Sequence, residues 1–220
     1  MKISILTLFP HMFDGFLSES IIKRAIQKGL VEIEIINIRD YSKHNNNQVD
    51  DTPYGGGAGM VMMIDVLVDC LNAIKKDYSK VYLMSPSGEV FKEKKAYSLT
   101  NERHLILICG HYEGVDERIN YYIDGKISIG DYILTGGELP SMVVSDAIIR
   151  LLDGVITKES IMTESFNNNL LDYPVYTKPA SYDGHDVPDV LLSGNHKLID
   201  EYRKSEQIRI TKEVRPDLLD

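Results

Sequence analysis

From residue 64 to residue 152 the chain alternates segments of helical periodicity with short apolar runs, and this alternation constrains the fold more than any other feature. Helices are predicted over residues 64–76, 93–100, 115–123 and 140–152, and strands over residues 80–84, 104–109 and 126–129. Strands separated by helices are joined by crossovers and therefore run parallel. The sequence predicts an α/β fold with a mostly parallel sheet and helices on both faces.

The first sixty residues extend this pattern and then interrupt it. Residues 2–8 predict a buried strand, and residues 12–28 predict an amphipathic helix that stops at Gly29. Residues 31–36 alternate apolar and acidic side chains, which indicates a strand nearer an edge of the sheet. A polar stretch over residues 40–59 follows and contains Gly55-Gly56-Gly57-Ala58-Gly59. A loop of this length is usually functional or mobile.

Three glycine-bearing loops follow predicted strands. They are Ser85-Pro86-Ser87-Gly88, Gly110-His111-Tyr112-Glu113-Gly114 and the segment from Ser128 to Pro140. Glycine lets backbone groups approach a small molecule where a Cβ would collide. Ligands of open parallel sheets bind outside the carboxyl ends of the strands, so the three loops predict one shared small-molecule site. The alternative is three ordinary strand-to-helix turns, because glycine is a common turn residue.

Composition limits the class of protein. The chain has 220 residues, of which 43% are hydrophobic, and this is enough to bury a core. Its two cysteines, Cys70 and Cys109, lie far apart in apolar runs and indicate neither a disulfide framework nor a zinc site. No signal peptide or membrane span is recognisable, so a soluble cytoplasmic protein is expected. The net charge of −9 argues against a strongly basic nucleic-acid binder, although it does not report local basic patches.

The common catalytic and phosphate-binding motifs are missing from the sequence. The glycine run at residues 55–59 lacks the last glycine of a dinucleotide-binding fingerprint, and there is no P-loop. The six histidines include no H-E-x-x-H pair, so no metal is expected. No nucleophile elbow of the form G-x-S-x-G occurs either. A dinucleotide or nucleoside triphosphate site and a metallohydrolase are therefore disfavoured.

The periodicity fades after residue 153, which indicates a change of domain. We expect a sheet domain over residues 1–157, an interdomain linker over residues 158–173 and a small helical domain over residues 174–220. The last domain is predicted from leucine, isoleucine and tyrosine residues at helical intervals after residue 187.

Four motifs in order resemble the bacterial tRNA (guanine-N1) methyltransferase family of the knotted SPOUT superfamily. They are Asp51 to Met60, Cys109 to Arg118, Ser128 to Pro140, and Leu191 to His196, and the likeness spans nearly the whole chain. The resemblance implies a deep trefoil knot in the sheet domain, although backbone knots are otherwise almost absent from proteins. It also implies that S-adenosyl-L-methionine is bound in that knot, and that the small C-terminal domain binds tRNA.

The resemblance assigns the cofactor to the glycine loops. Adenine and ribose are expected against backbone groups of one set of residues, and other residues complete the wall. By this carry-over the cofactor-binding residues are Ser85, Pro86, Gly110, Glu113, Ile129, Gly130, Asp131, Tyr132, Ile133, Leu134, Gly136, Gly137 and Pro140. For Tyr132 and Leu134, ordinary core packing is the alternative.

The family methylates N1 of the guanosine immediately 3′ of the anticodon, and N1 of neutral guanine carries a proton. A carboxylate that removes the proton and an arginine that stabilises charge on O6 meet both needs. Arg150 matches the family arginine. Glu164 stands where the family usually has Asp before Ser-Phe, in a linker that is one residue shorter, and Asp172 matches a second family acid. We expect Glu164 as the base and Asp172 as the alternative.

The resemblance further implies tRNA as partner and a homodimer whose site lies between subunits. Thr52 stands where the family often has Arg, so one RNA or subunit contact is expected to be lost. Basic residues of the C-terminal part are candidates for tRNA phosphates, with solvated surface charge as the alternative: Lys178, Lys197, Arg203, Lys204, Arg209, Lys212 and Arg215. Two other functions stay open, a catalytically silent RNA-binding module and a ribose 2′-O-methyltransferase.

Overall fold

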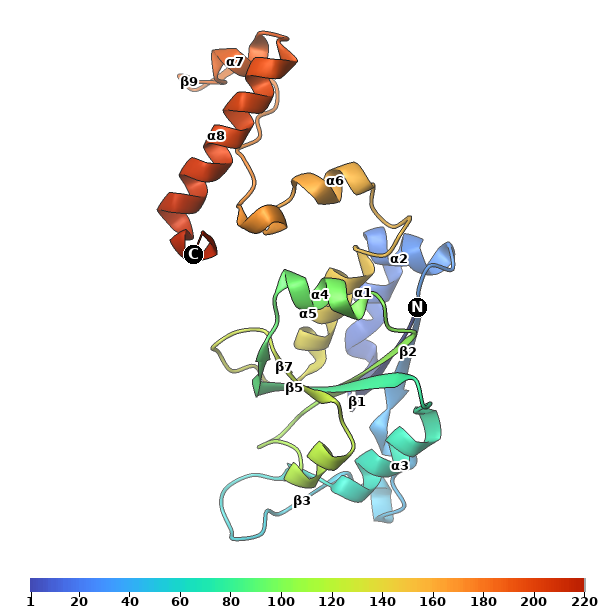
Figure 1. Cartoon of the computed structure of the whole chain (residues 1–220). Helices are drawn as coiled ribbons and strands as arrows, with labels where there is room; N and C mark the ends of the chain where they lie inside the picture. Colours follow the sequence, from blue (N-terminus) through green and yellow to red (C-terminus); the bar gives the residue numbers. More distant parts are fainter. Residues whose placement is uncertain (220) are drawn as a thin grey trace. The chain divides into compact units, whose positions relative to one another are not determined.

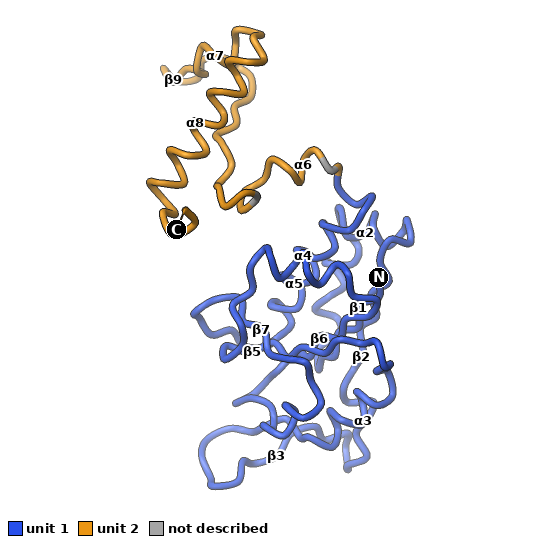
Figure 2. The backbone as a smooth tube through the Cα atoms, in the orientation of Figure 1, with its two compact units in different colours: residues 1–156 blue, residues 157–220 orange. Residues whose placement is uncertain are grey.

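The core of the fold is a five-stranded parallel sheet, in the order β2-β1-β6-β5-β7. The computed structural model describes residues 1–219 but not the side chains of Lys158 and Asn167, and Asp220, the end of the predicted C-terminal domain, lies outside the described residues. The chain divides into two compact units, Met1–Ile156 and Thr157–Asp220, which are coloured separately in Figure 2.

The strands of the first unit form where the apolar runs of the sequence lie. β6 is buried at every position and sits at the centre of the sheet, whereas β2 alternates in burial and forms an edge, as its sequence pattern predicts. The five strands of the sheet are β1 (Lys2–Thr7), β2 (Glu32–Asn37), β5 (Ser79–Val90), β6 (His104–Cys109) and β7 (Gly125–Ser128).

Helices cover both faces of the sheet (Figure 1). One face packs against α1, α2, α4 and α5 through a core that includes Phe13, Ile22, Leu99 and Val144. The other face packs against α3 through a second core, which includes Leu67. The helices of this unit are α1 (Asp14–Ser18), α2 (Ser20–Gln27), α3 (Ile64–Ile74), α4 (Glu93–Leu99) and α5 (Glu138–Ile149), with 3-10 turns η1 (Pro10–Phe13), η2 (Ile38–Tyr41), η3 (Asn45–Asn47) and η4 (Glu117–Tyr121).

Three predicted elements differ from the structure. The single helix predicted over residues 12–28 is broken, because Glu19 is extended and Ser20 has a φ of 52°. The helix predicted over residues 115–123 is only the 3-10 turn η4, because Val115 is drawn into a bridge with Met62. The predicted loop at residues 85–88 is an irregular part of β5, whose register against β7 shifts between Met84 and Glu89.

The long polar stretch contains a small hairpin of its own. β3 (Asp50–Asp51) pairs antiparallel with β4 (Val61–Met62), and the glycine-rich residues 55–59 form the connection between them. Gly55, Gly56, Gly57 and Gly59 all have positive φ angles, which a residue with a side chain rarely adopts. The glycine run is therefore needed for the shape of this connection.

The second unit is mostly helical. Its longest element is α8 (His196–Val214), which begins at Asn195, whose side chain accepts a hydrogen bond from the Leu198 N–H. Its other elements are α6 (Lys158–Thr163), η5 (Asn167–Asn169), the short hairpin β8 (Ser181–Tyr182) and β9 (His185–Asp186), α7 (Asp189–Leu192) and η6 (Pro216–Leu218).

Candidate functional site

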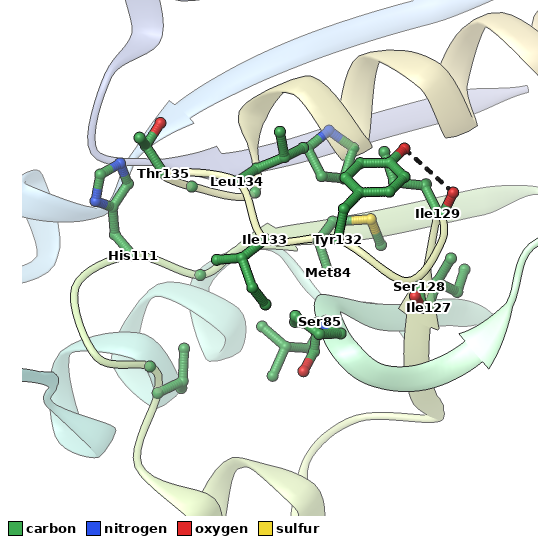
Figure 3. Close-up of a pocket in the computed structure, with 18 of the residues that line it drawn as sticks. Met84, Ser85, His111, Ile127, Ser128, Ile129, Tyr132, Ile133, Leu134 and Thr135 are labelled. Carbon is green, nitrogen blue, oxygen red and sulfur yellow. Dashed lines mark hydrogen bonds between the residues drawn. The ribbon is translucent and has the colours of Figure 1, made fainter.

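A pocket of about 340 Å³ lies at the carboxyl ends of β6 and β7 and beside residues 83–86, in the middle of β5. Figure 3 shows its residues, with His111 and Thr135 toward one end and Ser128, Ile129 and Tyr132 toward the other. All three glycine-bearing segments contribute residues to it, so they meet at one pocket, and its use as a ligand site stays a prediction. The pocket residues are Leu83, Met84, Ser85, Pro86, Gly110, His111, Tyr112, Glu113, Gly114, Val115, Ile127, Ser128, Ile129, Gly130, Tyr132, Ile133, Leu134, Thr135, Gly136, Gly137 and Pro140.

The loop of residues 128–137 lies directly on the end of the central strand. The Gly137 N–H donates to the Gly110 carbonyl over 2.8 Å. A Cβ at Gly137 would stand 2.6 Å from Cys109 Cα and 2.8 Å from the Gly110 nitrogen, far closer than packed carbon atoms come. Only glycine permits this backbone-to-backbone approach, which fixes one side of the pocket.

The outer part of the same loop is shaped by Tyr132. The Tyr132 hydroxyl donates to the Ile129 carbonyl over 3.3 Å, the bond dashed in Figure 3, and the Tyr132 N–H donates to the Gly130 carbonyl over 3.0 Å. Gly130 has a φ of 143°, and a Cβ there would lie 2.6 Å from the tyrosine ring. Ile133 is 80% exposed. The loop therefore offers bare backbone and apolar side chains to whatever occupies the pocket.

A buried carboxylate supports the pocket from below. Glu138, the first residue of α5, is 2% exposed and accepts a hydrogen bond from the Thr7 hydroxyl over 2.8 Å. Its Oε2 lies 3.7 Å from Nε2 of His111, and the His111 ring packs on Phe9 with centroids 4.8 Å apart. A Cβ at Gly136 would collide with Glu138 Oε2 and lie 2.6 Å from His111 Nε2. Glu138 and His111 therefore leave no room for a side chain at position 136.

The glycine-rich connection of the β3–β4 hairpin borders the same region. The Glu113 N–H donates to the Met60 carbonyl and the Met62 N–H donates to the Gly114 carbonyl, each over 3.0 Å. Gly59 lies against the Glu113 side chain, because a Cβ there would be 2.5 Å from Glu113 Oε1. The long polar stretch is thus joined by backbone hydrogen bonds to a segment that lines the pocket.

The sequence-predicted cofactor residues converge on this pocket with one exception. Asp131 is exposed and does not line it, whereas all the others do. Nine further lining residues were not among the predicted cofactor residues. His111, Tyr112, Gly114, Ser128 and Thr135 lie inside the predicted loops, whereas Leu83, Met84, Val115 and Ile127 lie outside them. Most are direct sequence neighbours of predicted residues, and the ends of the predicted strands could have indicated them.

The three predicted catalytic residues belong to different units. Arg150 follows α5 in the first unit, and its Nη1 lies 3.9 Å from Glu93 Oε1. Glu164 follows α6 in the second unit and is half-buried. Asp172 is also half-buried there, and its Oδ1 accepts the Tyr173 N–H over 2.7 Å.

The cysteines are unsuited to nucleophilic chemistry. Cys109 lies beneath Gly137, and its Sγ is 3.2 Å from the Ser141 hydroxyl. Burial raises the pKa of the Cys109 thiol well above its usual range, and burial raises the pKa of Cys70 to about 12. A thiolate at either position is therefore disfavoured.

The residues that the structure describes contain neither a metal-binding cluster nor a membrane-spanning helix. Among these residues no group of three or more His, Cys, Asp or Glu side chains is placed to hold a metal ion. No helix in the described part of the chain has the length and apolar character needed to cross a membrane.

Comparison with known proteins covers the whole chain. A family model described as tRNA (Guanine-1)-methyltransferase TrmD matches residues 1–220. A tRNA (guanine-N(1)-)-methyltransferase of Ureaplasma urealyticum serovar 10 is 57% identical over 219 residues, or 99% of this chain and 96% of that relative. Relatives with the same description from Malacoplasma penetrans and Anoxybacillus flavithermus are 56% and 52% identical, over 99% and 100% of this chain and 96% and 92% of their own.

Proposed function

The chain belongs to the tRNA (guanine-N1)-methyltransferase family, and we propose that it transfers a methyl group from S-adenosyl-L-methionine to N1 of the guanosine immediately 3′ of the tRNA anticodon. The observation that carries this proposal is the pocket in which three glycine-bearing segments meet at the carboxyl edge of the sheet. It supports a small ligand read by backbone groups.

The residues of the pocket fit S-adenosyl-L-methionine. A Cβ at Gly130, Gly136 or Gly137 would collide with neighbouring protein atoms, so glycine lets the loop lie where it forms one wall of the pocket. Ile133 and Leu134 supply apolar surface for a purine ring. The cofactor, when bound, supplies an electrophilic methyl group on a sulfonium. Gly110 and the loop residues Ile129, Gly130, Tyr132, Ile133 and Leu134 would hold its adenosine part. Asp131, which does not line the pocket, is left out of this set. The wall would be completed by Ser85, Pro86, Glu113, Gly136, Gly137 and Pro140.

We propose that the sheet domain is knotted, over residues 1–157, with a linker over residues 158–173 and a tRNA-binding helical domain over residues 174–220. Two close contacts between backbone segments support this proposal. The Gly137 N–H donates to the Gly110 carbonyl, and a Cβ added at Gly88 would lie 2.5 Å from the Ile127 nitrogen. The proposed active form is a homodimer in which the linker of one subunit serves the pocket of the other. Bacterial cytoplasm is the proposed location.

The chemistry needs a proton acceptor and a cation. Glu164, or Asp172 in its place, would take the proton from guanine N1 while the N1–methyl bond forms. The cofactor would give up the methyl group in the same step and keep the bonding pair on its sulfur as a neutral thioether. Arg150 would stabilise the negative charge that develops on guanine O6. General-base assistance of this kind contributes roughly 10²–10⁴-fold.

The test is transfer of a labelled methyl group to unmodified tRNA, followed by mapping of the modified atom. Label on N1 of the guanosine 3′ of the anticodon is expected. Label on a ribose 2′ oxygen would assign the chain to ribose methylation, and tRNA binding without transfer would make it a silent RNA-binding module. Either result would overturn the proposal.

The assignment of the base is tested separately. Glu164→Gln keeps the size of the side chain but removes the proton acceptor, so single-turnover transfer is expected to fall by ~10² or more. Asp172→Asn is expected to do less. The reverse ranking would make Asp172 the base.

A further inference from the structure

The acid-bearing segment of the second unit is closed into a loop by two hydrogen bonds within itself, one to a side-chain hydroxyl and one between backbone groups. We define it as residues 164–172. The Asp172 N–H donates to the Ser165 hydroxyl over 2.9 Å, and the Phe166 N–H donates to the Leu170 carbonyl over 2.7 Å. These two bonds bring Ser165, the neighbour of Glu164, beside Asp172. The two candidate bases are therefore held by one closed loop rather than by an extended linker.

Helix α8 contacts this loop on both sides of Asp172. On one side the Leu171 N–H donates to the Thr211 hydroxyl over 2.9 Å. On the other side the Arg203 guanidinium lies 4.9 Å from the centre of the Tyr173 ring, a distance at which a cation and an aromatic face attract. Both neighbours of Asp172 in the sequence are thus fixed to the same helix.

Thr211 is the more buried of these two anchors. It is 0% exposed, and it is the one residue in the buried class among the residues that the structure describes after Ile149. Its hydroxyl also donates to the Gln207 carbonyl over 2.6 Å, so the oxygen can receive the Leu171 N–H while its own proton is engaged. A buried hydroxyl with donor and acceptor roles both filled holds its partners in a single geometry.

We propose that Thr211 is a positioning residue for methyl transfer. Through Leu171 it sets the place of Asp172, and through the bond from Asp172 to Ser165 it sets the place of Glu164. The same helix carries Arg203 and Lys212, two of the candidate contacts for tRNA phosphates, so the base and the RNA-binding surface share one rigid support. This inference rests on the proposed function, since it assigns a role to the segment that carries the proposed base.

The first experiment measures the contact directly. In full-length protein labelled with ¹⁵N-leucine, the Leu171 amide is expected to exchange slowly with solvent. Thr211→Val removes the hydroxyl at nearly constant volume and is expected to raise that exchange rate by ~10-fold or more, because the amide loses its acceptor. Thr211→Ser restores the hydroxyl and should restore slow exchange. Fast exchange in the wild-type protein would overturn the inference at its first step.

The second experiment measures the consequence. At saturating tRNA, Thr211→Val is expected to lower single-turnover methyl transfer by ~10-fold with the dissociation constants for tRNA and S-adenosyl-L-methionine within ~2-fold of wild type, because misplacement of a reacting group affects the rate of the step. Thr211→Ser should recover the rate. Ser205→Ala is the matched control, because Ser205 lies on the same helix and its hydroxyl donates to the Tyr202 carbonyl within that helix.

The outcomes separate this inference from the proposed function. If Thr211→Val frees the Leu171 amide but leaves the rate unchanged while Glu164→Gln is crippling, the positioning role is wrong and the proposed function stands. If neither Glu164→Gln nor Asp172→Asn lowers the rate, the assignment of the base fails and takes the positioning role with it. If Ser205→Ala slows transfer as much as Thr211→Val, the effect belongs to helix stability and not to the anchored loop, and the inference is wrong.

Discussion

The glycine loop at residues 128–137 and the acid-bearing segment at residues 164–172 are held by different kinds of contact. The glycine loop is joined to the end of β6 by backbone, through the Gly137 N–H to the Gly110 carbonyl and through close approaches that exclude a Cβ, while the Tyr132 hydroxyl bonds within the loop. The acid-bearing segment has one backbone bond within itself, from the Phe166 N–H to the Leu170 carbonyl, and is otherwise held by the hydroxyls of Ser165 and Thr211. The glycine loop stands on the end of a fully buried strand, whereas the acid-bearing segment has one buried anchor.

This difference matches the two proposed tasks. A site that binds its cofactor through protein backbone groups must be formed before the cofactor arrives. Close backbone packing gives such a preformed surface. A base that must meet a nucleotide from another molecule can instead be carried by a segment with few, specific anchors. The comparison predicts that glycine substitutions damage binding, whereas changes at the acids damage the chemical step.

The largest effect is expected at Gly136. Gly136→Val would drive a side chain into Glu138 and His111 beneath the pocket. Displacement of the loop is expected to weaken S-adenosyl-L-methionine binding by ~10²-fold or more, with little change in folding. Calorimetric titration measures it. Gly15→Val is the matched control, because a Cβ at Gly15 has nothing within 4 Å. Equal affinity in Gly136→Val and wild type would remove this pocket as the cofactor site.

A second pair of variants tests how closely backbone packs beneath the pocket. A Cβ at Gly88 would lie 2.5 Å from the Ile127 nitrogen in β7, so Gly88→Ala forces backbone to move. It is expected to lower the free energy of unfolding by ~1–3 kcal/mol. Gly15→Ala, in the exposed helix α1, is expected to raise it by ~0.5–1 kcal/mol. Urea denaturation measures both, and the same sign for both changes would contradict the packing argument.

The smallest effect is expected at the amino-terminal end of the central strand β6, the end away from the pocket. His104 is buried there, with its two ring nitrogens 2.7 Å from Ser79 Oγ and 2.9 Å from Ser4 Oγ. Burial lowers the pKa of His104. As pH falls below ~6.5 the unfolded chain takes up a proton that the folded chain resists, so the free energy of unfolding decreases toward the folded pKa.

His104→Asn should flatten that dependence and leave cofactor affinity unchanged. Denaturation curves at a series of pH values, compared between variant and wild type, measure the effect. Identical pH dependence in the two proteins would mean that His104 is not the group responsible. A change in cofactor affinity would mean that the amino-terminal end of β6 is coupled to the pocket at its carboxyl end.

Much of the fold was predictable because apolar runs report buried strands directly. The β6 prediction matches the structure at both ends, and five parallel strands with helices on both faces follow from the alternation. The failures lie where long-range contacts override local periodicity. Val115 pairs with Met62 and leaves only a 3-10 turn after it, and Ser20 adopts a positive φ that no apolar spacing reveals.

The site divides in the same way. Glycine spacing indicated the loops that line the pocket, because glycine is required by the backbone itself. Within those loops it did not single out His111 or Glu138. His111 packs on Phe9 and Glu138 accepts a hydrogen bond from Thr7, and each of these partners lies more than a hundred residues away in the sequence. Asp131 was included as part of a continuous run, yet its side chain is exposed outside the pocket. Thr211 gave no signal at all, since a single threonine on a polar helix resembles any other.

The central claim is that the pocket binds the cofactor whereas the acids act in the chemical step. It is tested most directly by calorimetric titration of S-adenosyl-L-methionine into the full-length Glu164→Gln, Asp172→Asn double variant. The account predicts the affinity of the wild-type protein in a variant whose single-turnover methyl transfer is reduced by ~10² or more. A loss of affinity comparable to that of Gly136→Val would contradict it, because the acids would then belong to the cofactor site rather than to the chemical step.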